Sequence, residues 1–216
     1  MSIKRSLFSI LILIGISSTV NAQIHGLSVL DTADQQGKGT MHILAGGFDA
    51  ENASLYGGRF AYGATDRLLV FTDLGVQNDY RFDPEFLGQA GMRYTLPVNL
   101  PFDLAIRSTA IPFISSYEHY FEITFGLLAS KYLDSDEKWA VYHNIGLDRQ
   151  WWELEVALDP AVAAFLGTDT YVDKGNKTDV TMTTGISRKL SGSSRFFIEA
   201  AKIDVEYFCA GIRFEL

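Results

Sequence analysis

Apolar and polar residues alternate along most of this chain with a period of two, in blocks of about ten residues. The clearest block is the last, residues 207–216, in which every second residue is apolar from Phe208 to Leu216. Arg213 and Glu215 belong to the opposite phase. Successive residues of a β-strand point to opposite faces, so each block predicts a strand with one apolar face and one more polar face.

Ten such blocks follow one another along the chain. They are residues 40–48, 54–62, 67–77, 87–96, 102–112, 117–129, 138–149, 178–188, 195–201 and 207–216. The connections at one end are compact or moderately long: 63–66, 97–101, 130–137 and 189–194. The connections at the other end include 78–86, the short 113–116 and the long 150–177. Short turns at one end and longer loops at the other are typical of membrane barrels. The pattern predicts an all-β fold, a single up-and-down antiparallel transmembrane β-barrel of about ten strands, within a range of 8–12.

The longest connection, residues 150–177, is expected to be a long extracellular loop. Its first residues still alternate, with Trp152 and Leu154 opposed to Glu153, so we expect the preceding strand to project beyond the membrane. Asp159 and the proline after it resemble a helix start, which predicts one short helix at 161–166. The alternative is an eleventh strand followed by a loop, but bacterial barrels favour even strand numbers.

The first 22 residues have the pattern of a secretory signal peptide. Lys4 and Arg5 precede an apolar run at 7–16, and small residues lead up to Ala22. The alternative is an uncleaved anchor, but a spanning helix needs about 20 apolar residues and this run is shorter. We therefore expect cleavage between Ala22 and Gln23, with 23–216 forming the barrel domain.

Composition and charge narrow the class of protein further. The 216 residues are 47% hydrophobic and 20% charged, which excludes a disordered chain and a multi-helix membrane bundle. The formal net charge of −8 becomes −10 once cleavage removes Lys4 and Arg5, and this acidity argues against nucleic-acid binding. The single cysteine, Cys209, cannot form an internal disulfide. A closed barrel is one way to hold an exported chain of this size without disulfides.

Two features favour a membrane barrel over a soluble one. The polar faces hold glycine, threonine, asparagine and isolated charges but few lysines, unlike a solvent-exposed sheet. Aromatic residues stand near the predicted strand ends, where the membrane–water interface favours them. The candidate interface aromatics are Tyr62, Tyr94, Tyr117, Trp139, Trp151 and Trp152. A soluble periplasmic or secreted ligand-binding barrel is the alternative.

The C-terminal residues carry a resemblance to a known class. Gly211, followed by Phe214 and Leu216, resembles the C-terminal assembly signal of bacterial outer-membrane β-barrels. The resemblance implies a location in the bacterial outer membrane after export. It also implies periplasmic chaperones and the barrel assembly machinery as partners during biogenesis, and outer-membrane lipids and lipopolysaccharide as neighbours afterwards.

Charged residues on the polar phases are candidates for a network inside the barrel. They are Arg59, Asp73, Arg93, Asp103, Arg107, Glu118, Glu122, Asp148, Glu199 and Arg213. Barrels of about eight strands are filled by side chains and those of 16–18 are open, so ten strands predict a filled lumen. We therefore expect a structural or surface-interaction role through the outer loops. A narrow channel for small solutes, with these charges as an ion-selecting constriction, is the alternative.

A second alternative is an outer-membrane enzyme that acts on lipid or peptide. Ser115, Glu118 and His119 bring the residue types of a catalytic triad close together, but their spacing neither shows nor excludes convergence in space. No two histidines have metal-ligand spacing, so we predict no catalytic residue, metal or cofactor. His143 falls on the lipid-facing phase of its strand, which predicts either a bulge or a contact with another subunit.

Overall fold

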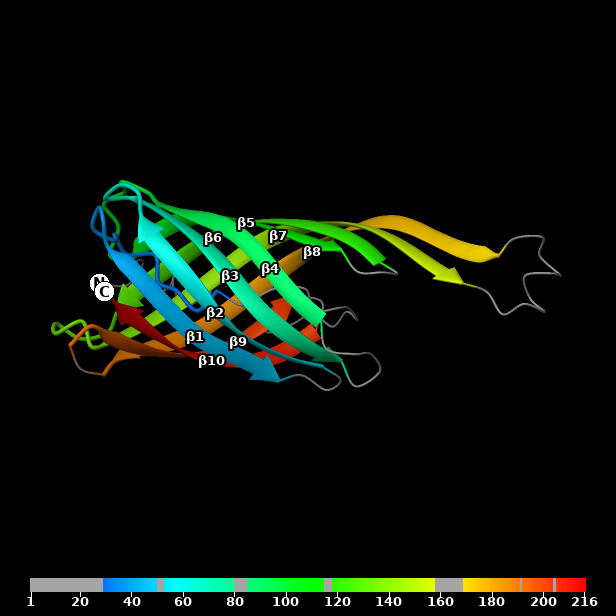
Figure 1. Ribbon diagram of the computed structural model, residues 1–216. Helices are drawn as coiled ribbons and strands as arrows, with labels where there is room; N and C mark the ends of the chain where they lie inside the picture. Colours follow the sequence, from blue (N-terminus) through cyan, green and yellow to red (C-terminus); the bar gives the residue numbers. More distant parts are fainter. Residues whose placement is uncertain are drawn as a thin grey trace.

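The computed structural model describes residues 29–49, 53–79, 85–114, 118–157, 169–190, 192–203 and 205–216. Each strand pairs antiparallel with its neighbours in sequence, and the first strand closes the barrel against the last (Figure 1). The strands are β1 Met41–Asp49, β2 Ala53–Gly63, β3 Leu68–Asp79, β4 Glu85–Thr95, β5 Asp103–Ile114, β6 Glu118–Tyr132, β7 Trp139–Ala157, β8 Thr170–Lys189, β9 Ser194–Ile203 and β10 Val205–Glu215. The predicted ten-strand up-and-down barrel is confirmed, because each alternating block lies on one strand of the closed barrel.

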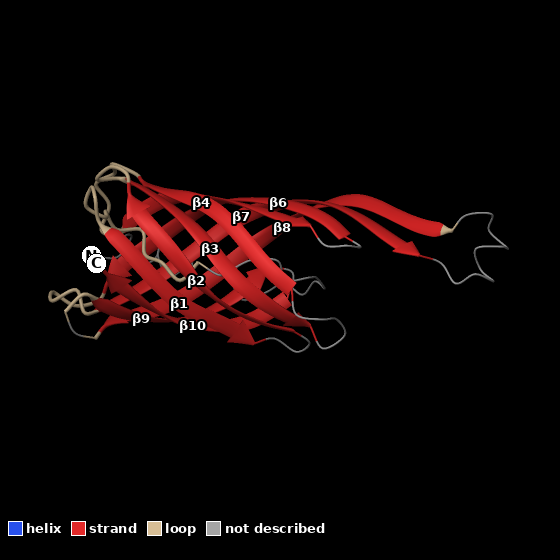
Figure 2. Cartoon of the chain, in the orientation of Figure 1, coloured by secondary structure: helices blue, strands red, loops and turns tan. Residues whose placement is uncertain are grey.

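Among the described residues, coloured in Figure 2, strands and loops make up the whole fold. None of the described residues belongs to a helix long and apolar enough to cross a membrane. The predicted signal peptide and the predicted short helix at 161–166 lie outside the described residues.

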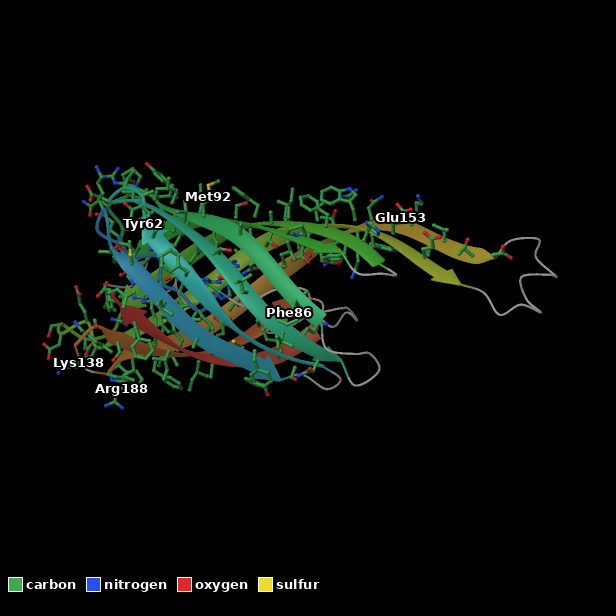
Figure 3. The ribbon with its side chains drawn as sticks, in the orientation of Figure 1. Tyr62, Phe86, Met92, Lys138, Glu153 and Arg188 are labelled. Carbon is green, nitrogen blue, oxygen red and sulfur yellow. The ribbon has the colours of Figure 1, made fainter. Side chains whose placement is uncertain are left out.

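The two faces of the barrel wall have opposite chemistry. Large apolar side chains point outward and are exposed, such as Leu74 (70%) and Phe208 (74%), and Tyr62 and Met92 also point outward in Figure 3. Polar and charged side chains on the alternate phase are buried inside; they include Asp73, Arg93 and Glu199. A soluble barrel has the reverse arrangement, so this distribution excludes the soluble alternative.

Two tryptophans on β7 mark the limits of the apolar band. Trp139 and Trp151 both point outward, and the strand between them matches the 9–11 residues that a spanning strand needs. The Cζ atom of Arg188 lies 5.0 Å from the Trp139 ring centroid, and that of Arg149 lies 5.4 Å from the Trp151 ring. Cation and aromatic ring thus meet at both boundaries of the band, where amphipathic side chains are stable.

Strands β7 and β8 continue well beyond the boundary at Trp151. Their pairing extends from Trp151 to Ala157, which lies opposite Thr170, and Figure 1 shows this hairpin projecting past the rest of the barrel. Much of the segment 150–177, expected to be a loop, is therefore paired strand. The expected projection of the strand before it is present, because the alternation at Trp152 and Glu153 continues the sheet. We call residues 151–157 and 170–178 the extension.

Candidate functional site

Residues 29–36 run from the interior of the barrel to its rim, and we call them the plug segment. Val29, Leu30, Asp31, Thr32 and Ala33 are all buried although none of them belongs to a strand. In Figure 1 this segment is the blue coil inside the ring of strands, next to β1. The lumen is therefore filled by a piece of the chain as well as by inward side chains.

A tight turn joins the plug segment to β1 at the end of the barrel opposite the extension. Thr40 donates its N–H to the Gly37 carbonyl (3.1 Å), and Gly39 donates to the Gly63 carbonyl (2.8 Å). Gly39 has a φ of 83°, in the left-handed region that glycine adopts without a steric penalty. The turn lets the chain leave the lumen, reverse at the rim and enter β1.

Side chains of the wall bind the backbone of the plug segment. The Leu30 N–H donates to Glu199 Oε2 and the Ala33 N–H donates to Ser130 Oγ, each at 2.8 Å. Arg59 Nη1 donates to the Val29 carbonyl at 2.6 Å. A buried segment without a strand partner must find its hydrogen bonds elsewhere, and here β2, β6 and β9 supply them.

The rim side of the plug segment is bound in the same way from β4 and β6. Arg93 donates to the Thr32 carbonyl and, through Nη2, to the Asp34 carbonyl (3.0 Å). Thr95 Oγ1 donates to the Ala33 carbonyl (3.0 Å), and the Tyr132 hydroxyl donates to Asp34 Oδ2 (3.2 Å). Strands β4 and β9 lie on opposite sides of the barrel, and both bind the plug segment, so the segment crosses the lumen.

Asp31 is the charged centre of the plug segment. One carboxylate oxygen lies 2.8 Å from Arg93 Nη1 and the other lies 3.0 Å from Arg213 Nη1. Asp31 precedes the first spanning strand. Burial alone would raise the pKa of Asp31, but the charges of Arg93 and Arg213 outweigh burial and hold this pKa below its ordinary value. The carboxylate is thus ionised and fully paired.

A second ion pair lies beside the plug segment. Arg59 makes a two-point contact with Asp73, Nε to Oδ1 at 2.7 Å and Nη2 to Oδ2 at 2.8 Å, and Gln89 also donates to Asp73. The guanidinium carbons of Arg59 and Arg107 lie 4.3 and 5.1 Å from the centroid of the Phe71 ring. Two-point pairing fixes both side chains in orientation as well as in charge.

Acidic side chains form a separate layer on β6 and β7, nearer the extension. Glu122 and Asp148 are buried there. Tyr120 donates to Glu122, Thr124 Oγ1 lies 3.3 Å from a carboxylate oxygen of each acid, and Gln150 donates to Asp148 at 2.5 Å. The lumen therefore has an arginine-rich layer around the plug segment and an acidic layer beyond it.

The other predicted lumen residues are less central or not described. Asp103 is partly buried at the start of β5, and Arg213 reaches the plug segment from β10. The side chain of Glu118 lies outside the described residues. Arg107 and Glu199 are buried in the wall, and Glu199 also accepts a hydrogen bond from the Tyr142 hydroxyl (2.8 Å).

The predicted interface aromatics do not all face lipid. Tyr62, Tyr94, Trp139 and Trp151 are exposed on the outside, whereas Tyr117 lies outside the described residues. Trp152 differs from the prediction, because it is partly buried and packs against the hydrophobic cluster inside the barrel. Neighbours along a strand point to opposite faces, so Trp151 and Trp152 cannot both lie at the lipid boundary.

The C-terminal residues contribute to both faces of the barrel wall. Phe214 (45% exposed) and Leu216 (71%) point outward. Gly211 faces inward, where a β-carbon would lie 2.9 Å from Leu30 Cδ1. The missing side chain at Gly211 thus makes room for the plug segment. Cys209, also on the inner phase, is a free and buried thiol.

His143 shows that one of the two explanations from the sequence was wrong. The β7/β8 register is unbroken through the pair His143 and Thr184, so there is no bulge at this position. Its Nδ1 lies 2.7 Å from Thr184 Oγ1, and the side chain is buried among its neighbours. A contact with another subunit stays a prediction.

The plug segment is the functional feature that the sequence reasoning missed. Its residues show no strand or helix period, and its position depends on side chains more than 100 residues away, such as Glu199 and Arg213. The one local signal was the pair of inward glycines, Gly46 and Gly211, which contact Leu30.

No protein-family model matches the chain, and no curated protein matches it. Solved structures with a similar fold include the COG4313 outer membrane channel from Pseudomonas putida F1, with 9% identity and a TM-score of 0.48 over 88% of this chain and 100% of that chain. The N-terminal β-barrel domain of Pseudomonas aeruginosa OprF has 14% identity and a TM-score of 0.39 over 84% of this chain and 100% of that domain. The attachment invasion locus protein Ail of Yersinia pestis has 9% identity and a TM-score of 0.36 over 84% of this chain and 100% of that one. These likenesses concern the fold alone. By its own strand order and apolar exterior, the chain is a small β-barrel of the outer-membrane type.

Proposed function

We propose that this protein is a closed barrel of the bacterial outer membrane that displays the extension at the cell surface for contacts with other molecules. The observation that carries the proposal is the pairing of β7 with β8 beyond the boundary at Trp151. The barrel wall then serves as an anchor, and the plug segment keeps it closed.

The chemistry of the extension supports exposure to water. Glu153 and Lys174 form an ion pair across the two strands at 2.5 Å, with both side chains about half exposed, and Glu155 is exposed. Figure 3 places Glu153 at the far end of the molecule from Lys138 and Arg188. Trp152 lies over Gly175, where an added β-carbon would overlap the indole ring. Trp152 thus packs on the facing strand of the hairpin that carries the charged side chains.

The occupied lumen supports a closed barrel over a narrow channel. Asp31, Thr32 and Ala33 cross the lumen and are each bound to the wall, so solute passage requires the plug segment to move. The channel alternative would have to include that movement.

The enzyme alternative has little support in the described residues. His119 is exposed on β6, while residues 115–117 and the side chain of Glu118 lie outside the described part. The proposal therefore assigns no catalytic step. It keeps lipopolysaccharide and outer-membrane lipids as neighbours of the wall, and the assembly machinery as the partner that inserts it. The outward Arg149–Trp151 pair and the C-terminal Phe214 support these partners.

Thiol labelling on intact cells tests the display of the extension. The native thiol, Cys209, is buried, so a new cysteine gives the signal. Asn176→Cys places a thiol on the exposed extension, and Ser135→Cys places one on the exposed turn at the opposite end. A membrane-impermeant maleimide should label Asn176→Cys on intact cells and Ser135→Cys only after lysis. The reverse pattern would overturn the proposed orientation.

The contact role needs its own test. Replacing residues 153–174 by an Asn-Gly turn shortens the hairpin and leaves the membrane-spanning strands intact. Cells that display the shortened variant should lose attachment to a protein-coated surface that cells displaying the full chain retain. Equal attachment by both strains would contradict the contact role while leaving the orientation unaffected.

A further inference from the structure

The wall around the plug segment carries more positive than negative charge. Four described arginines, Arg59, Arg93, Arg107 and Arg213, face this layer or lie within electrostatic range of Asp31. The wall carboxylates within range of them are Asp73, which pairs with Arg59, Glu199, and Asp103, which interacts electrostatically with Arg93. The wall alone therefore leaves arginine charge unmatched at this level.

The plug segment supplies the missing acceptors. The Asp31 carboxylate bridges Arg93 and Arg213, with one oxygen toward each. The carbonyl groups of Val29 and Thr32 accept further hydrogen bonds from Arg59 and Arg93. The segment thus binds as an anionic ligand would.

Arg107 provides an independent sign of an anion site. It is buried, with 6% of its surface exposed, and its Nε and Nη2 atoms have no hydrogen-bond partner in the part of the chain that the structure describes. A buried guanidinium with unused donors, within electrostatic range of the bound Asp31 carboxylate, indicates spare capacity for an anion.

We propose that Arg93 and Arg213 form a carboxylate-binding site in the lumen, supported by Arg59 and Arg107, and that Asp31 is its tethered ligand. The barrel is closed because its own chain occupies this site. If the plug segment withdraws, the site binds a small carboxylate or the carboxylate of an acidic peptide. Surface display by the extension requires no such site, so this inference is independent of the proposed function.

Chemical rescue in the full chain tests the site. Asp31→Ala removes the carboxylate and leaves a space between the two arginines, which formate can fill. We expect formate to raise the temperature at which the folded Asp31→Ala barrel unfolds on a gel, in a saturable manner, because a ligand that binds only the folded state stabilises it. Neutral formamide and chloride at the same concentration should leave this temperature unchanged.

Two matched variants act as controls. Asp31→Asn fills the same space with a neutral amide, so formate should have no effect on it. Asp34→Ala removes the neighbouring carboxylate, which contacts Tyr132 and Gln36, and should not respond to formate either.

Each outcome decides the proposal. A formate response confined to Asp31→Ala supports it, and the same response in all variants or in none overturns it. If Asp31→Ala fails to fold without formate, its folding yield becomes the measurement. Recovery of that yield by formate supports the site, and failure to recover it, while Asp31→Asn folds, overturns it.

Discussion

Leu30 in the plug segment packs against Gly211 of β10, so closely that a β-carbon at Gly211 would lie 2.9 Å from Leu30 Cδ1. The backbone carbonyl of Ala45 is 3.1 Å from the same position, so a β-carbon at Gly211 would also be crowded by the backbone of β1. Gly211 thus belongs both to the C-terminal pattern resembling an assembly signal and to the seat of the plug segment.

This contact predicts a non-additive pair of substitutions. Gly211→Ala should lower the free energy of unfolding by about 1–3 kcal/mol through overpacking, and Leu30→Ala should lower it by about 2–5 kcal/mol through lost burial. The double variant should lose less free energy of unfolding than the two single variants lose together, because Leu30→Ala makes room for the new methyl group. Urea titrations followed by gel mobility measure the three values. Strict additivity would contradict the packing of Leu30 on Gly211.

Removing one partner of the Arg59–Asp73 pair should cost more stability than removing both. Arg59→Met leaves the Asp73 carboxylate buried without its cation, which should cost about 3–5 kcal/mol of stability. Asp73→Leu in addition should recover part of that loss, because both charges are then gone. Arg149→Met on the outer surface is the control and should cost less than about 1 kcal/mol. Equal effects of Arg59→Met and Arg149→Met in urea titrations would contradict a buried pair.

The three tryptophans of the chain should differ in their contact with lipid. Trp139 and Trp151 point outward at the two boundaries, whereas Trp152 packs inside over Gly175. In variants that retain one tryptophan, with phenylalanine at the other two positions, lipids with brominated acyl chains should quench Trp139 and Trp151 strongly and Trp152 weakly. Strong quenching of Trp152 would show that the strand phase at this boundary is misassigned.

The hydrogen bond between His143 and Thr184 should contribute little to stability. Within a membrane such side-chain hydrogen bonds average about 0.6 kcal/mol in double-mutant cycles. A cycle of His143→Ala and Thr184→Ala should therefore give a coupling of about that size, measured by urea titration. A coupling of several kcal/mol would indicate a structural role beyond this single contact.

The sequence predicted the strands well because the barrel wall obeys a local rule. A strand with lipid on one side and lumen on the other alternates at every residue, and this alternation located each of the ten strands. The same rule placed Arg59, Asp73, Arg93 and Glu199 on the inner phase, where the structure has them. It also separates Trp151 from Trp152, a consequence missed when both were grouped as interface aromatics.

The plug segment could not be predicted in this way. Asp31 is buried only because Arg93 and Arg213 reach it from strands that lie far away along the chain. Such a position follows from the closed barrel as a whole and leaves no periodic trace. The sequence placed Glu122 and Asp148 inside the barrel but did not group them in an acidic layer, since charges of both signs were expected to mix and several arginines gather around the plug segment instead.

Single-channel recording tests the central claim of a closed barrel most directly. The full-length protein, shown to be folded by its heat-modifiable gel mobility, is reconstituted in vesicles that are fused to a planar bilayer. The occupied lumen predicts no stable conductance steps from the wild-type protein. Regular ohmic steps from the same folded preparation would contradict the claim that residues 29–36 close the lumen.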